Sequence, residues 1–216
     1  VGVQGPERAA SAVRTNPVRR ENLRRLSGAY WWVVALGAVF TLARFSEAFL
    51  VLRVQQGGLP LAWTPLVLVL MNVVFALGAY PLVKLADSTR HTTLLAWGLV
   101  VLIAADALLA FSDRGAAAWL GIALWGLHMA MTQGLLATMV ADTAPADLRG
   151  TAFGMFNRVS GVALLVASGL AGLLWDRLGA SATFGAGILF ATLALAGVLV
   201  QSARHGRAPK PPATQG

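Results

Sequence analysis

The sequence predicts an all-α membrane protein with six transmembrane helices, and three observations support that fold class. Only 12% of the residues are charged and 57% are hydrophobic, whereas about a quarter of the residues in a soluble domain are charged. The apolar residues gather in long runs without the polar stripe of a soluble amphipathic helix. Short connections with turn residues separate these runs.

A helix that crosses the bilayer core needs about 20 mostly apolar residues. Six segments meet this requirement, at 29–53, 61–83, 92–111, 117–140, 150–174 and 180–201. The first reads as one long apolar helix. Pro60, Pro81 and Pro145 are expected to mark helix ends, because proline disfavours the helical conformation of the residue before it.

The basic residues predict the orientation and the domain organisation. With six spans, twelve Lys and Arg residues fall on the side of the two tails and three on the opposite side. Since cytoplasmic loops carry the excess of Lys and Arg, we expect both tails to be cytoplasmic, in a bacterial inner (plasma) membrane. The chain then divides into a basic leader (1–28), a six-helix domain (29–201) and a tail (202–216).

The sequence contains no pattern typical of an enzyme or of a nucleic-acid-binding protein. The net charge of +8 comes mostly from the two tails, which favours membrane orientation over nucleic-acid binding. The chain has no cysteine, no Gly-rich phosphate loop and no metal-ligand cluster, and its three histidines are widely separated. We therefore expect no enzyme activity, cofactor or metal.

Two loops carry motifs, and together they identify a resemblance. Residues 78–91 read GAYPLVKLADSTRH, and residues 142–150 read DTAPADLRG. The first resembles the cytoplasmic loop motif of the major facilitator superfamily, although Val83, Arg90 and His91 depart from the usual pattern. The second resembles the acidic-x-x-Pro…Arg-Gly loop before the eleventh helix of that superfamily.

The resemblance implies a fold, partners and a function. Members have two six-helix halves, each built from two three-helix inverted repeats. The chain resembles the C-terminal half, and its leader resembles the central cytoplasmic loop, so a missing N-terminal half or a second copy is the expected partner. The implied function is secondary active transport of a small solute by alternating access, proton-coupled, with efflux as one direction. The alternative is a six-helix membrane scaffold or assembly protein that does not transport.

The resemblance also implies roles for the loop residues. Asp87 is expected to act as a conformational latch by meeting a helix N-terminus or a basic residue, with a solvated loop carboxylate as the alternative. Asp142 and Arg149 flank Pro145 and are candidates for an ion pair, or serve solubility and anchoring alone. The loop-motif set comprises Lys84, Asp87, Asp142, Arg149 and Gly150.

Ionisable and polar residues inside the spans are the candidates for substrate binding or proton coupling. A charged side chain at the bilayer centre costs about 2.5–3.5 kcal/mol on insertion scales, so it usually serves function. The candidates are Arg44, Glu47, Asn72, Asp106, His128, Gln133 and Arg158. Each also has a structural interpretation, as a hydrogen-bonding partner between helices or a side chain that reaches the interface.

Three expectations concern particular candidates. Arg44 and Glu47 are three residues apart on one predicted helix, so they share a face and are expected to pair. Because Arg44 supplies Glu47 with a counter-charge, Asp106 is the better candidate for the proton site, with a carboxylate near the outer interface as the alternative. The glycines of the fifth span predict close helix packing, with a hinge as the alternative.

Overall fold

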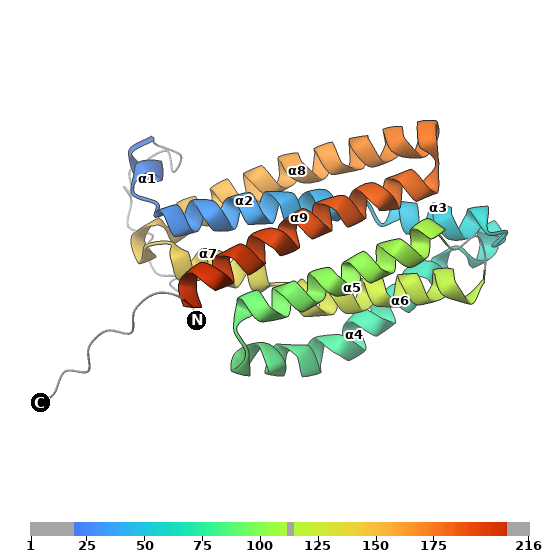
Figure 1. Ribbon diagram of the computed structural model, residues 1–216, viewed down its shortest axis with the longest axis horizontal. Coiled ribbons are helices and arrows are strands. Elements are labelled where there is room, and N and C mark those ends of the chain that lie inside the picture. The colour runs from blue at the N-terminus through green and yellow to red at the C-terminus, as the bar shows by residue number, and fades with distance from the viewer. Residues whose placement is uncertain (1–19, 112–114, 207–216) are drawn as a thin grey trace, which may run out of the picture.

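The computed structural model describes residues 20–111 and 115–206, and within these ranges the chain forms helices and no strand. The helices lie side by side in one elongated bundle (Figure 1). The elements are α1 (Arg20–Arg24), α2 (Gly28–Ala43), α3 (Ala48–Gln56), η1 (Leu61–Trp63), α4 (Pro65–Ser88), α5 (His91–Phe111), α6 (Ala116–Thr132), α7 (Leu135–Thr143), η2 (Ala146–Leu148), α8 (Arg149–Leu178) and α9 (Ala180–Gly206).

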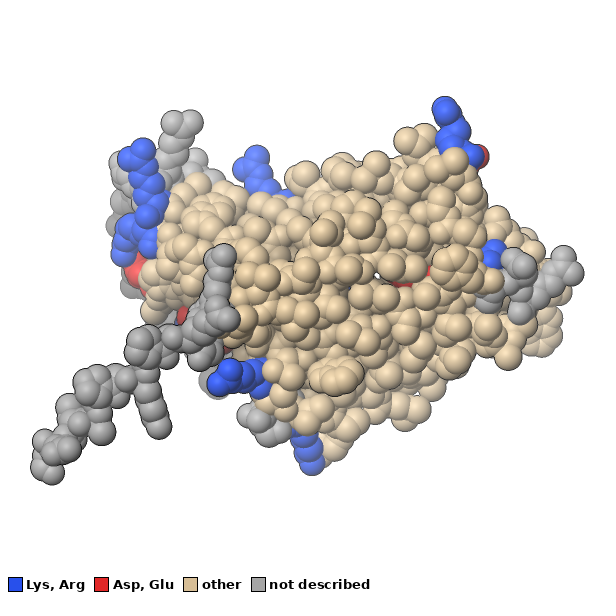
Figure 2. All heavy atoms as spheres, viewed as in Figure 1, with Lys and Arg blue, Asp and Glu red and all other residues tan. Residues whose placement is uncertain are grey.

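The predicted fold class is confirmed. Six stretches are long and apolar enough to cross a membrane, namely Gly28–Gln56, Leu61–Leu82, His91–Phe111, Ala116–Thr143, Ala146–Leu178 and Ala180–Ala203. Uncharged residues cover the long sides of the bundle, whereas most of the visible Lys and Arg side chains lie toward its two ends (Figure 2). This distribution suits a protein whose sides face lipid and whose ends face water.

The first span is interrupted, so the prediction of one continuous helix over 29–53 is wrong. Helix α2 ends at Ala43 and α3 begins at Ala48. The backbone N–H of Arg44 donates to the carbonyl of Thr41 at 3.1 Å, which tightens the last turn of α2. The helix restarts where the hydroxyl of Ser46 accepts a hydrogen bond from the N–H of Ala48 at 3.3 Å.

The fourth span is interrupted as well. Helix α6 ends at Thr132 and α7 begins at Leu135. Gln133 is extended, with ψ near 125°, and Gly134 has a φ of +86°, in the left-handed region that glycine adopts without strain. The bundle therefore contains two spans with non-helical backbone between their helical parts.

Pro81 lies inside α4 and does not end it, so that expectation is also wrong. Helix α4 continues from Pro65 to Ser88. A proline inside a helix removes one backbone hydrogen bond and crowds the preceding turn, but membrane helices tolerate this loss when other groups satisfy the freed carbonyl.

Helix α5 packs against α6 and α9, and glycines allow the close contacts of α6. A Cβ atom at Gly98 of α5 would overlap the side chain of Thr132 on α6. A Cβ atom at Gly126 of α6 would overlap the backbone carbonyl oxygen of Met71 on α4. These contacts fix where α6 presents its side chains.

The glycines of α8 do not pack against other parts of the described chain. A Cβ atom at Gly154, Gly161 or Gly169 would meet no heavy atom within 4 Å. The predicted close helix packing along this stripe is therefore absent among residues 20–111 and 115–206. Helices α4 and α8 instead expose large apolar side chains, including Val73, Leu77, Val162, Leu165 and Leu173.

Candidate functional site

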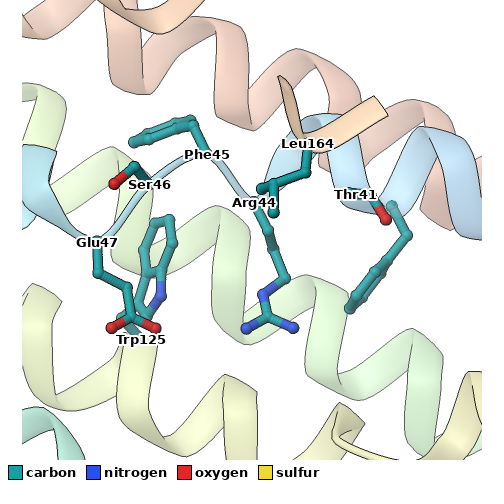
Figure 3. A pocket seen from close by; sticks show the side chains of 8 residues that line it. Thr41, Arg44, Phe45, Ser46, Glu47, Trp125 and Leu164 are labelled. Carbon is teal, nitrogen blue, oxygen red and sulfur yellow. The ribbon is translucent and has the colours of Figure 1, made fainter. Parts of the chain in front are cut away.

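The interruption of the first span forms one wall of a cavity inside the bundle. The cavity has a volume of about 400 Å³, within the range of small-molecule sites. Residues from α2, the interruption, α6 and α8 line it, namely Phe40, Thr41, Arg44, Phe45, Ser46, Glu47, Trp125 and Leu164. Figure 3 shows that the side chains of Arg44 and Glu47 extend from the interruption in the same general direction.

Arg44 and Glu47 both line the cavity, but they do not form the ion pair that the sequence predicted. Within the described ranges an ion pair joins Arg25 to Asp147, and the imidazole of His91 lies 3.9 Å from the carboxylate of Asp142. The prediction failed because it assumed a continuous helix, in which residues three apart share a face. Since 44–47 is non-helical, the two head groups stay apart, although their charges still interact electrostatically.

The helix ends at the interruption suit the charges that they carry. Arg44 is the C-cap of α2, and Glu47 is the N-cap of α3. The aligned peptide dipoles leave partial negative charge at a helix C-terminus and partial positive charge at an N-terminus. Each charged residue therefore lies at the helix end of opposite sign, which favours both by about 0.3–1 kcal/mol each.

Phe45 anchors the interruption through an aromatic cluster. Its ring centroid lies 5.5 Å from that of Phe49, 5.6 Å from that of Trp125 and 5.5 Å from that of Phe184. These separations fall in the range of favourable aromatic contacts. Because Phe45 is buried among rings from α3, α6 and α9, the backbone on either side of it is held in place.

Several polar atoms at and near the cavity are buried without a hydrogen-bonding partner in the described chain. They include Nε of Arg44 and the indole Nε1 of Trp125. A buried donor without a partner costs about 1–3 kcal/mol. These buried donors make the wall of the cavity polar, although neither atom is open to the cavity in this conformation.

His128 lies behind Phe40, with ring centroids 5.6 Å apart, and is fully buried. Its Nδ1 lies 2.7 Å from the carbonyl oxygen of Gly98. Because a carbonyl only accepts, Nδ1 carries a hydrogen, and in the neutral ring Nε2 is an acceptor. Nε2 has no partner in the described chain. His128 thus links α6 to α5 and supports the wall of the cavity without lining it.

Asp106 lies on α5, outside the cavity, and is fully buried. Its carboxylate packs onto α9 at Gly187, in space that a side chain there would fill. Phe45 approaches the same point of α9, since a Cβ atom at Gly187 would lie 3.1 Å from its Cε1. Neither carboxylate oxygen has a hydrogen-bonding partner in the described part of the chain. Asp106 and the interruption of the first span therefore share the same site on α9.

The structure does not bring the other three intramembrane candidates to the cavity. Asn72 is exposed on α4 and donates to the carbonyl of Leu68 at 2.8 Å. Gln133 is exposed at the second interruption, and Arg158 is exposed on α8. Sequence reasoning also missed Phe45 and Trp125. Trp125 offered one signal, since it lies deep within a span and not near an end, where tryptophans are enriched.

The loop residues make partly different contacts from those expected. Asp142 lies 3.9 Å from Nδ1 of His91, and Arg149 is exposed, so the candidate Asp142–Arg149 pair is not formed. The short ion pair of this region joins Arg25 to Asp147 at 2.7 Å. Asp142 and Asp147 both flank Pro145, so the sequence alone does not show which of the two carboxylates pairs with an arginine.

Lys84 places its ammonium group 4.6 Å from the ring centroid of Tyr80, a cation–π contact one turn away on α4. Asp87 lies in the last turn of α4, but its side chain is outside the described part of the chain, so its latch role stays a prediction. Gly150 is the second residue of α8, is exposed, and has open space where a side chain would be.

The fold and the site together define a class of protein. The chain has six candidate spans, two of them interrupted, and a cavity whose wall carries charged side chains at broken helix ends. Discontinuous helices with ion- or substrate-binding ends are typical of secondary transporters.

The chain belongs to the Major Facilitator Superfamily, whose family model matches residues 3–168. It is 30% identical, over 148 residues, to an uncharacterized MFS-type transporter of the archaeon Methanocaldococcus jannaschii. The alignment covers 66% of this chain and 37% of that relative, so the chain matches well under half of the relative's length. No solved structure matches the chain significantly. The suggested resemblance is thus confirmed at the level of the family.

Proposed function

We propose that this chain is the C-terminal half of a secondary transporter that moves a small solute across the membrane by alternating access. The observation that carries the proposal is the cavity at the interrupted first span, where Arg44 and Glu47 offer two opposite charges to a ligand. In this proposal the interruption binds the substrate, and movement against a second six-helix body opens the cavity to either side.

The proposal that the chain is a half rests on two features. Helices α4 and α8 expose large apolar side chains along the bundle, a surface suited to lipid and to a second helical body. The two interrupted spans also correspond: α2 and α3 have 16 and 9 residues, and α6 and α7 have 17 and 9. Each is the first of three consecutive spans, which supports two inverted repeats.

We further propose that both termini are cytoplasmic, as the charge bias favours, and that the motif around Lys84 and Asp87 serves as a latch at that side.

Substituted-cysteine labelling tests alternating access, and the cysteine-free sequence of this chain suits the method. Ser46 lines the cavity and is exposed, so Ser46→Cys reports on its access. The complete protein, without other cysteines, is placed in right-side-out and inside-out vesicles and treated with a membrane-impermeant maleimide. Alternating access predicts labelling from both sides. Ala116→Cys, at the first residue of α6, is the control and should react from one side alone.

Labelling of Ser46→Cys from a single side, or from neither, while the Ala116→Cys control behaves as expected, contradicts the proposal. That result favours the static scaffold.

Proton coupling is proposed for Asp106. An ionised carboxylate buried without a partner is costly, so a bound proton or a partner in another conformation must offset its charge. The helices packed against α5 bring few titratable groups near Asp106. Helix α6 carries His128, which is bonded at Gly98, and α9 carries none over 180–203. Helix α7 carries Asp142, which lies beside His91 at the opposite end of α5. Because Phe45 packs at the same place on α9, the state of Asp106 acts directly on the interruption.

The labelling assay also tests this role. We expect the ratio of inside to outside labelling of Ser46→Cys to change between acidic and mildly alkaline pH. Adding Asp106→Asn, which keeps the shape and removes the titration, should abolish that change. Adding Asn72→Asp on the exposed face of α4 should leave it intact. A pH response that persists unchanged in Asp106→Asn excludes this residue as the coupling site.

A further inference from the structure

The cavity wall carries one cationic and one anionic side chain that do not form an ion pair with each other. Arg44 and Glu47 both line the cavity, and no ion pair joins them within the described chain. The helix ends and the anchored ring of Phe45 hold the residues that carry them in place. A pair of opposite charges held apart across a cavity leaves a place for a ligand that bridges them.

Charge balance selects the class of ligand. An anion alone would bind Arg44 but face the carboxylate of Glu47, and a cation alone would face the guanidinium of Arg44. In an environment of low dielectric constant, either would leave one charge unpaired, at a high cost. A ligand with one positive and one negative group pairs both and leaves the filled cavity neutral.

The remaining lining residues extend this match. The buried indole of Trp125 adds an aromatic face to the cavity wall and packs against the ring of Phe45. The hydroxyl of Thr41 donates to the carbonyl of Gly37 at 2.7 Å, so its oxygen remains free to accept. Phe40, Phe45 and Leu164 give the rest of the wall an apolar character, suited to one hydrocarbon substituent.

We propose that the cavity binds a small amino-acid-like zwitterion, with its carboxylate on Arg44 and its ammonium group on Glu47. This inference rests on the proposed function, because it names the substrate class of the same cavity. The volume of about 400 Å³ accommodates such a molecule together with water.

Three probes of one hydrocarbon skeleton test the proposal. L-leucine carries both charges, 4-methylpentanoate lacks the ammonium group, and 3-methylbutylamine lacks the carboxylate. Binding is measured on the complete protein in detergent as the rise in melting temperature, since a ligand that binds only the folded state stabilises it by an amount that grows with the logarithm of its concentration divided by its Kd. The wild-type protein should be stabilised by leucine and by neither single-charge analogue at the same concentration.

Two variants should change the charge selectivity in opposite directions. Glu47→Gln should weaken leucine binding about 10-fold or more and make 4-methylpentanoate the better ligand. Arg44→Gln should also weaken leucine binding and favour 3-methylbutylamine. Arg177→Gln, which removes an exposed arginine at the end of α8, is the control and should keep the wild-type preference.

The proposal is overturned if the wild-type protein binds an analogue as well as leucine, or if none of the three probes stabilises it. It is also overturned if both cavity variants keep the wild-type preference. Cysteine labelling of Ser46→Cys needs no ligand. If the melting assay excludes a zwitterion, the labelling assay still tests alternating access independently.

Discussion

The contact between Asp106 and Gly187 predicts a strong and specific coupling between two residues on different spans. A Cβ atom at Gly187 would overlap Oδ2 of Asp106 and lie 3.2 Å from its Cγ. Gly187→Ala must therefore move a fully buried carboxylate that has no alternative partner in the described chain, or push α9 away from α5. Overpacking of this kind costs about 1–3 kcal/mol.

The size of the effect follows from that clash. For a chain of this length, about 1 kcal/mol shifts the melting temperature by roughly 2–4 °C, so Gly187→Ala should lower it by roughly 2–12 °C. In an Asp106→Ala background the oxygen is gone, and the nearest remaining atom is Cε1 of Phe45 at 3.1 Å, a ring edge that can shift by a few tenths of an ångström. The same substitution should then cost less than about 1 kcal/mol.

The assay is thermal unfolding of the purified protein in detergent, for the wild type, both single variants and the double variant. The double-mutant cycle should give an interaction energy of about 1–2 kcal/mol, within the range for residues in contact. Gly185→Ala is the matched control, because it lies on the same helix with open space around it. Equal destabilisation by Gly187→Ala in both backgrounds, or none in either, would refute the proposed packing of the carboxylate.

Two further predictions use the same unfolding assay. Gly126→Ala should destabilise the protein by at least as much as Gly187→Ala. The added Cβ would meet the backbone oxygen of Met71, which cannot move without separating α4 from α6. A variant as stable as the wild type would contradict this prediction. Tyr30→Phe should lower stability by about 1 kcal/mol, since the Tyr30 hydroxyl donates to the buried carbonyl of Ala152 at 3.0 Å, and an unchanged melting temperature would show that this bond contributes nothing.

The number and approximate bounds of the spans could be predicted from sequence, because the length of an apolar run is a local property. The interruptions were missed because nothing in hydropathy separates a straight apolar helix from a broken one. Two local signals were present: Ser46 has the hydroxyl of a helix-starting residue, and Gly134 follows the polar Gln133. Both are weak alone, since serine and glycine are frequent in membrane helices.

The candidate site could be predicted only in part. Arg44 and Glu47 were recognised because a charge inside a span is costly, and that argument needs no structure. The absence of an ion pair between them was not predicted, because it depends on the conformation of the backbone between residues 44 and 47. The contribution of Trp125 depends on neighbours from α2 and the first interruption, which no pattern near residue 125 describes. Asn72 and Arg158 are exposed because of how their helices are turned about their own axes relative to the bundle. The spacing of residues within one span does not reveal that orientation.

The anchoring of Phe45 has a consequence for how the protein is made. During synthesis the first span enters the membrane long before α6 and α9 leave the ribosome, so Trp125 and Phe184 are then absent. Until they arrive, the ring of Phe45 has only its near neighbour Phe49 to pack against. The interruption thus gains its last aromatic contact from the final helix, and in a chain truncated before α9 the ring of Phe45 should be held by Phe49 and Trp125 alone.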